Sequence, residues 1–406
     1  MSNSVSLFLS LCMLLPTAVA QQASSLPTLA VAPAELADAQ RTAAALLQSP
    51  PTNGAAHAGA VLVAIRTGDA SAAARLLAQG RERLSVAGAT DAEGVAWLVC
   101  SHLWVLRAFG ERERMAPRLP ELLQAAERAA AQAPTRSFAQ ECMQVHMLFC
   151  VGNLLDHCER GHRRLASQPG ARWAERAVER LLELERRSWQ PGVGHYRPTL
   201  TSGEITVPAA ADASLLIPAA AGMLIGSGDR ILRHLHTTLA AAKITAADPH
   251  YLAAATLCRD AATRARSYTA LRASDALQDP ARAGFAFDAM CYAVSGLRLA
   301  VGAAVDEDWV RFSPWLPPGC SQLELLGLCS HGARFDLQLA GDGGPTLRLQ
   351  LRLVSARDEA SRTIVVHAGA EQRLQILTVG ETLTTELARP QAEAQHELLP
   401  RGSGGH

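Results

Sequence analysis

The spacing of apolar residues changes once along the chain, near Ala304, and this change limits the folds that the sequence can adopt. From about residue 34 to 305, apolar residues recur every three or four positions, in Ala- and Leu-rich segments that end at Gly or Pro. After Asp306–Asp308, apolar and polar residues alternate, with Gly-rich turns between the runs. The predicted strands are Gln322–Leu328, Arg334–Leu339, Thr346–Val354, Thr363–His367 and Arg373–Leu377. The pattern predicts a mainly α protein, with helices at 34–305 and a small antiparallel, β-sandwich-like domain at 306–390.

The pattern at 34–305 predicts about ten to twelve helices that follow one another as hairpins joined by short loops. The predicted helices include Asp91–Phe109, Ser137–Arg160, Arg172–Arg187 and His250–Ala265. No repeat of fixed length is visible, so a solenoid is disfavoured. A closed ring of helical hairpins accounts better for the number of helices. The abundance of alanine, the strongest helix former, agrees with a helical domain.

The first twenty residues have the pattern of an export signal. An apolar run from Val5 to Leu15 ends at Pro16, and Ala18-Val19-Ala20 provides a small-x-small cleavage site before Gln21. The run has no Lys or Arg before it, so a buried N-terminal helix is the alternative. We expect a secreted or periplasmic protein with a signal peptide at 1–20, an extended segment at 21–33 and a disordered polar tail at 391–406.

Charge and hydropathy exclude two classes of partner. The chain has 38 basic and 38 acidic residues, and no basic patch stands out, which argues against nucleic acid. The N-terminal apolar run is too short to span a bilayer, and every other long apolar stretch carries charge or proline. We therefore expect no membrane span, and the oligomeric state stays open.

Eight cysteines follow the expected signal, and none of them forms a CxxC motif, which disfavours zinc-ribbon and thioredoxin-like sites. Most lie among apolar residues, where a buried thiol is the usual state. Cys320 and Cys329 both fall in the predicted β-domain and are the candidate disulfide of an exported protein. We predict no metal site and no cofactor, because His234 and His236, for example, point to different faces of their helix.

Three stretches of the chain carry a resemblance to known enzymes. Thr90–Pro120 has an Asp-x-x-Gly start, an aromatic helix and an acidic end. Trp173–Gly226 contains a Trp-x-x-x-x-Gly-x-aromatic loop and then Asp-Ala-Ser-Leu-Leu. Trp309–Leu339 contains Phe-Ser-Pro-Trp-Leu-Pro-Pro-Gly before alternating leucines. In this order the stretches resemble the six-hairpin glycosidases, an (α/α)6 toroid with a C-terminal β-domain, and most closely their glucoamylase-like and debranching-enzyme-like members.

The resemblance implies a carbohydrate-active, glycoside-hydrolase-like protein that hydrolyses or binds an oligosaccharide or polysaccharide in the toroid cavity. The chain departs from the family at the catalytic positions. Glucoamylase-like members place the general acid in a Trp-Glu pair, where this chain has Pro134–Phe138. Gln140-Glu141 is the nearest match to the Val-Glu of the debranching-enzyme-like members, and no counterpart of the C-terminal base motif is found.

Carboxylates near the starts of predicted inner helices are the candidates for catalysis. Inverting hydrolysis needs two carboxyl groups roughly 6.5–9.5 Å apart. Glu93 and Glu141 are the candidate acid and base, and Asp91 is a candidate ligand for sugar hydroxyls. The alternative for all three is helix capping, because acidic residues favour the first turn of a helix.

Aromatic and polar residues complete the candidate substrate site. Trp97 and Trp189 could stack on sugar rings, although Trp97 shares a helix face with Trp104 and could belong to a core stripe. His195 and Tyr196 lie in the long loop Ser188–Pro208, where they could bind hydroxyls, and the alternative is a turn that packs its tyrosine in the core. Asp212 is a candidate cavity residue or the cap of the next helix.

Four hypotheses for function follow from these residues. The first is a glycoside hydrolase, and the second is a sugar-binding relative without catalytic activity. The third is a polysaccharide lyase that uses His195 and Tyr196 as base and acid, and the fourth is a helical interaction scaffold with no small-molecule site. For the sugar-site hypotheses we expect one cavity, at the end of the ring where inner helices begin, lined by Asp91, Glu93, Trp189, His195 and Tyr196.

Overall fold

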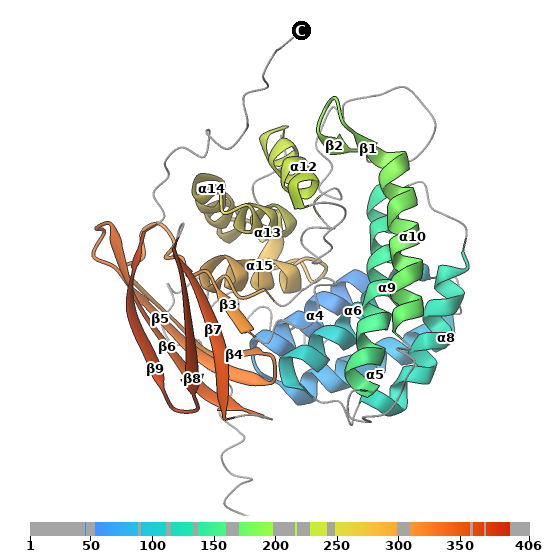
Figure 1. The fold of residues 1–406 in the computed structure, drawn as a ribbon, viewed down its shortest axis with the longest axis horizontal. Helices are drawn as coiled ribbons and strands as arrows, with labels where there is room; N and C mark the ends of the chain where they lie inside the picture. The colour runs from blue at the N-terminus through green and yellow to red at the C-terminus, as the bar shows by residue number, and fades with distance from the viewer. Residues whose placement is uncertain are drawn as a thin grey trace, which may run out of the picture.

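The computed structural model describes most of the helical and β parts of the chain (Figure 1). The expected signal peptide, the segment at 21–33, the polar tail and Asp212 lie outside the described residues. The described residues are 45, 53–87, 91–110, 115–132, 137–159, 170–197, 216, 228–241, 248–298, 309–357, 360–368 and 371–389.

Ten α-helices and nine β-strands lie within the described residues, so the fold is mainly helical with small β-sheets. Figure 1 shows the helices on one side of the molecule and the larger sheets on the other. The helices are α4 (Gly54–Arg66), α5 (Ala70–Ala87), α6 (Ala92–Phe109), α8 (Leu119–Ala130), α9 (Phe138–Glu159), α10 (Ala171–Ser188), α12 (Gly228–Ala241), α13 (Pro249–Leu257), α14 (Ala261–Arg272) and α15 (Ala283–Ser295).

Capping residues determine where α6 begins and ends. The Asp91 side chain accepts a hydrogen bond from the Gly94 backbone N–H at 2.8 Å, which satisfies a donor that has no partner within the helix. Gly110 ends the helix in the left-handed conformation, with a φ of 67°. The sequence prediction of a helix from Asp91 to Phe109 therefore agrees with the structure to within one residue.

The expected helix from His250 to Ala265 is instead two helices, α13 and α14. Arg259 adopts a φ of 57°, which interrupts the helical backbone. Asp260 then caps α14 by accepting from the Thr263 backbone N–H at 3.0 Å. The hydrophobic pattern continues across this break, so periodicity alone did not reveal it.

Burial divides the helices into two kinds. Helices α4, α6, α9 and α15 are buried nearly all round, whereas α5, α8 and α10 bury one stripe and expose the opposite face. Helix α4 contacts α6 and α15, and α6 contacts α9. The amphipathic helices pack on the buried helices next to them in the chain. The buried helices therefore form an inner layer with amphipathic helices outside it.

Helices α4 and α15 approach so closely that two glycines face each other. A Cβ atom on Gly284 would lie 2.7 Å from the Cα of Gly59 and even closer to other backbone atoms of that residue. Because the obstacle is backbone, no side-chain rotation can relieve the clash. This contact joins the first and the last described helices of the helical part.

Gly284→Ala is expected to lower the free energy of unfolding by about 1–3 kcal/mol through overpacking. A decrease in the free energy of unfolding would be informative, because Gly→Ala inside a helix otherwise stabilises the helix. Urea unfolding followed by circular dichroism measures the effect. Gly192→Ala is the control, since a Cβ at Gly192 meets no atom within 4 Å and should leave stability nearly unchanged. Equal stability of Gly284→Ala and the parent would show that the helices separate without cost.

The β part contains two larger sheets. The four-stranded sheet is antiparallel, with the order β4-β5-β6-β9, and the three-stranded sheet has the order β3-β7-β8. Strand β3 pairs with β7 in parallel, so the expected all-antiparallel domain is wrong for this pair. Strand β3 is separated from β7 by β4, β5 and β6, so no hairpin turn fixes its direction. The strands are β3 (Trp309–Phe312), β4 (Gln322–Ser330), β5 (Ala333–Ala340), β6 (Thr346–Ala356), β7 (Ser361–Ala368), β8 (Glu371–Thr378) and β9 (Thr382–Ala388).

One hydrophobic cluster joins both sheets to the helices. Alternate residues of β6, such as Leu349 and Leu351, are fully buried and cluster with Ile364 of β7 and with Met290 of α15. The alternation of buried and exposed residues along β6 has the period of two that predicts a strand. The β-sheets therefore pack on the helical part rather than forming a separate core.

The sheets are attached at the C-terminal ends of two inner helices. The Gly332 N–H donates to the carbonyl of Arg107, near the end of α6, at 3.1 Å, and the Ser313 N–H donates to the carbonyl of Ser295 in α15 at 3.0 Å. Helix α6 begins at Ala92, so its N-terminus lies roughly 23 Å from the attachment at Arg107. The N-terminal end of α6 is thus left free of the sheets.

Two further expectations concern the described residues as a whole. None of the eight cysteines among them forms a disulfide, so the expected Cys320–Cys329 bond is not present. None of the described helices combines the length and the apolar character that crossing a bilayer requires.

Candidate functional site

A pocket of about 1120 Å³ opens at the N-terminal ends of α4 and α6, against the C-terminal half of α5. Two neighbouring inner helices begin at its wall. The pocket brings together Asp91, Glu93 and Trp97 of the sequence-predicted site. Its described lining residues are Asn53, Gly54, Ala55, His57, Gln79, Gly80, Glu82, Arg83, Leu84, Asp91, Glu93, Gly94, Trp97, Leu98 and Ser101.

The two carboxylates are positioned by the first turn of α6. Asp91 is the residue that caps the helix, and only one of its oxygens, Oδ1, accepts from the Gly94 N–H. Gly94 must be small, because a Cβ there would collide with the Asp91 carboxylate. Glu93 is exposed in the first turn, where the helix dipole favours a negative charge.

Trp97 forms part of the pocket wall but is mostly core. Its side chain is 3% exposed and packs against Trp104 and Phe285, with ring centroids 6.3 and 5.4 Å away. Its indole N–H donates to Glu93 Oε1 at 3.4 Å. Trp97 therefore orients the Glu93 carboxylate, and little of its ring is available for stacking on a sugar.

Two buried acceptors of the pocket lack a hydrogen-bond partner among the described residues. The His57 Nε2 lies 2.7 Å from the carbonyl oxygen of Leu76 and must carry the proton to donate to it, which leaves Nδ1 as an unpaired acceptor. The Gln79 Oε1 is likewise buried and without a partner. Burial and the nearby Arg83 lower the pKa of His57, so the ring stays neutral. Both residues line the pocket, but these two atoms are covered by protein, so a ligand can bond to them only when neighbouring side chains move.

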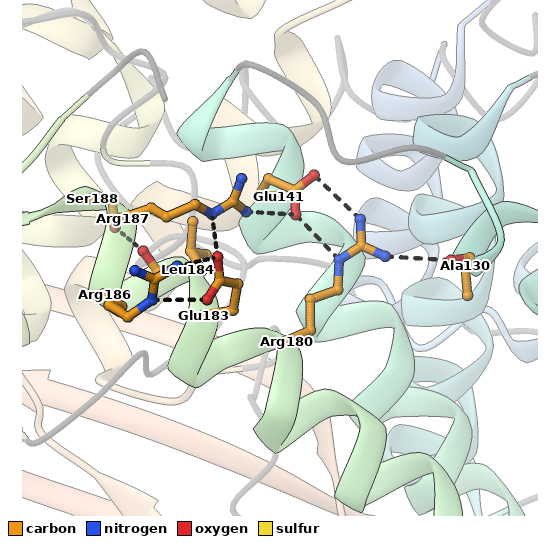
Figure 2. Close-up of polar contacts among 8 residues, drawn as sticks. All are labelled: Ala130, Glu141, Arg180, Glu183, Leu184, Arg186, Arg187 and Ser188. Carbon is orange, nitrogen blue, oxygen red and sulfur yellow. Dashed lines mark hydrogen bonds and ion pairs between the residues drawn. The ribbon is translucent and has the colours of Figure 1, made fainter. Parts of the chain in front are cut away.

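The structure does not bring Glu141 into this pocket. Figure 2 shows Glu141 in α9 facing Arg180 of α10, whose guanidinium donates to both carboxylate oxygens at 3.1 and 3.2 Å. Arg187 lies 3.9 Å from the same carboxylate, and the Glu141 side chain is fully buried. These contacts make Glu141 a buried ion-pair partner that joins α9 to α10, and not a carboxylate that shares the pocket with Glu93.

The expected long loop after α10 begins as a β-hairpin and lies apart from the pocket. Strands β1 (Trp189–Gln190) and β2 (His195–Tyr196) pair as an antiparallel ladder. None of Trp189, His195 and Tyr196 lines the pocket, so the expectation of one cavity shared with Asp91 and Glu93 is wrong for this pocket. They instead gather near the start of α9, where Tyr196 stacks on Phe138 with ring centroids 4.8 Å apart.

The contacts of Tyr196 disfavour a role as a lyase acid. Its hydroxyl donates to Glu185 Oε1 at 2.7 Å, and the ring is 1% exposed. Burial and the Glu185 carboxylate raise the pKa of Tyr196 well above its ordinary value. His195 is buried beside it, with Nδ1 3.0 Å from the carbonyl oxygen of Tyr196. The Arg230 guanidinium lies over the Trp189 ring, 5.6 Å from its centroid. This face of the ring is therefore covered and not open for stacking on a sugar.

Sequence reasoning found the carboxylates of the pocket and missed its acceptors. His57 and Gln79 lie on α4 and α5, in segments that read only as Ala- and Leu-rich helix. One signal was available: Asn53 caps α4 by accepting from the Ala56 N–H at 2.7 Å, as Asp91 caps α6. Two capped helices that lie side by side bring their first turns together.

Comparison with known proteins leaves the pocket to be interpreted from its own chemistry. No family model matches the sequence, and no curated protein matches it either.

Proposed function

We propose that the protein binds an oligosaccharide in the pocket at the N-terminal ends of α4 and α6. The observation that carries this proposal is the set of acceptors on the pocket wall. Asp91 and Glu93 line the pocket together with His57 and Gln79, whose Nδ1 and Oε1 have no hydrogen-bond partner among the described residues. A ligand that satisfies all of them must offer several hydrogen-bond donors at short spacing. The hydroxyl groups of a sugar provide such donors, and Arg83 in the same wall can donate to the sugar oxygens.

We also propose that the helical part is an (α/α)6 toroid. Contacts between described elements support this arrangement because they close a circuit. They run from α15 through α4, α6 and α9 to α10, and from the hairpin that follows α10 through α12 and α13 back to α15. In such a ring the inner helices begin at one end, and the pocket lies where two of them begin.

Binding is favoured over hydrolysis because the expected catalytic pair is not assembled in the pocket. Glycoside hydrolysis needs one carboxyl group that donates a proton and one that activates water or attacks carbon. Glu141, the expected partner of Glu93, has both oxygens on Arg180 and lies outside the pocket. If turnover is nevertheless measured, Glu93 would have to act with a carboxylate other than Glu141.

Asp91→Asn and Glu93→Gln are each expected to weaken sugar binding about tenfold or more, because each removes a charged hydrogen-bond acceptor. Asn retains the helix cap, so Asp91→Asn should leave stability nearly unchanged. Isothermal titration calorimetry against a panel of mono- and oligosaccharides measures binding, and product analysis in parallel samples measures turnover. Glu371→Gln, an exposed change on β8, is the control. The proposal is refuted if no sugar binds the parent, or if both pocket variants bind as tightly as the control.

A further inference from the structure

Two thiols and an imidazole meet in the core between α6 and α9, away from the pocket. Cys100 comes from α6, and His146 and Cys150 lie one turn apart on α9, so they share a helix face. Their ligand atoms all lie within 4.8 Å of one another. The Sγ atoms of Cys100 and Cys150 are 3.8 Å apart, and the His146 Nε2 lies 3.5 Å from the Cys150 Sγ. All three side chains are buried, at 0–1% exposure.

We propose that Cys100, His146 and Cys150 bind a zinc ion. A tetrahedral ion with Zn–S bonds of about 2.3 Å and Zn–N bonds of about 2.0 Å holds two sulfurs about 3.8 Å apart, and a sulfur and a nitrogen about 3.5 Å apart. These are the two separations that the cluster already has at Cys150. The third separation, between the ligand atoms of Cys100 and His146, is at most 4.8 Å, so zinc binding would shorten it by no more than about 1.3 Å.

The chemistry of the three residues also suits a divalent thiophilic ion. Thiolate and imidazole ligands select zinc over the hard cations that prefer oxygen. Two thiolates cancel the charge of one Zn²⁺, so the loaded site adds no net charge to the core. Among the described residues no fourth His, Cys, Asp or Glu belongs to the group, which leaves one tetrahedral position for a small exogenous ligand.

The other reading of the cluster is a packed group of neutral core side chains. That reading explains a buried thiol such as Cys142, which has no His or Cys ligand group around it within the described residues. Thiol hydrogen bonds to a sulfur and to the imidazole would give the same two distances, so retention of metal, and not distance, distinguishes this reading from a zinc site. A disulfide is a further alternative, but it requires the two sulfurs to approach to about 2.0 Å.

Because the ligand atoms are inaccessible in the folded protein, the ion has to enter while the chain folds. The test therefore unfolds the reduced full chain in denaturant and refolds it with Zn²⁺ or with Co²⁺, followed by desalting. We expect one equivalent of either metal to be retained per chain. The cobalt form should show thiolate-to-metal charge-transfer absorption together with the intense visible bands of a tetrahedral site. The thermal midpoint should be higher for the zinc-refolded protein than for protein refolded with a chelator.

Cys150→Ala should reduce metal retention at least tenfold, whereas Cys142→Ala should retain the full equivalent. Cys142 is the matched control because it is equally buried and lies on the same helix. If Cys150→Ala does not fold, the cobalt spectrum of the parent still decides, since it reports thiolate coordination directly. Three results would overturn the proposal: no zinc retained by the refolded parent, equal loss of metal in both variants, or retention of Cu(I) without retention of Zn²⁺. The experiment needs no sugar, so its outcome is independent of the proposed sugar binding.

Discussion

Glu141→Gln is expected to destabilise the protein by about 3 kcal/mol, because it removes the negative member of a buried ion pair. The Glu141 side chain is fully buried, and that of its partner Arg180 is 18% exposed. Gln keeps one acceptor oxygen, but its NH2 group cannot accept, so the Arg180 guanidinium keeps its desolvation cost and loses its anionic partner and one of its two hydrogen bonds. The loss should also loosen the packing of α9 against α10, which these bonds join.

Urea unfolding of four proteins tests this prediction: the parent, Glu141→Gln, Arg180→Gln and the double variant. The double variant should be more stable than the sum of the single changes predicts, because neither charge is then left unpaired. Glu127→Gln is the matched control, since Glu127 of α8 pairs with Arg176 of α10 at the surface and should change stability little. A Glu141→Gln variant that keeps its stability but loses a measured sugar turnover would instead identify Glu141 as a catalytic residue.

The broad fold could be predicted because it depends on local patterns. Helical periodicity and capping residues located α6, α9 and α10 to within about one residue, and alternation located strands β4 to β8. Strand β9 was missed, because Thr382–Ala388 is mostly polar and exposed. The parallel pairing of β3 was also missed, since pairing direction depends on a partner more than 50 positions away.

The pocket could be predicted only in part, for a physical reason. Asp91 and Glu93 could be recognised because the preference for acidic residues at the start of a helix depends only on the backbone next to them. The unpaired state of His57 Nδ1 is a property of everything around that atom, and no sequence spacing encodes it. The same holds for Glu141: its place in the first turns of α9 was predicted, but Arg180, 39 positions away, decides what the carboxylate does.

The second large effect concerns His102, which is buried uncharged in α6. Its side chain is inaccessible to solvent, its Nδ1–H donates to the Leu98 carbonyl at 2.8 Å, and its Nε2 accepts from Arg81 at 3.0 Å. A second proton on the ring would eliminate the acceptor that Arg81 needs and bring two cations together. Burial first, and then the charge of Arg81, lower the pKa of His102 to about 4 from its ordinary 6.5.

The stability of the protein is therefore expected to fall as the pH is lowered from 6.5 to about 4. Above pH 6.5 the ring is neutral in both the folded and the unfolded chain, and its contribution does not vary with pH. Between pH 6.5 and 4 only the unfolded chain takes up the proton, which favours unfolding by about 3 kcal/mol over the interval. Burial also lowers the pKa values of His57 and His250, which adds to the loss in the same direction.

His102→Gln should be less stable than the parent at neutral pH, yet its free energy of unfolding should fall less on acidification. The measurement is a series of urea unfolding curves from pH 7 to 4, with His236→Gln, an exposed position on α12, as the control. If His102→Gln and the control show the same pH dependence, then His102 is not the group that is protonated on unfolding.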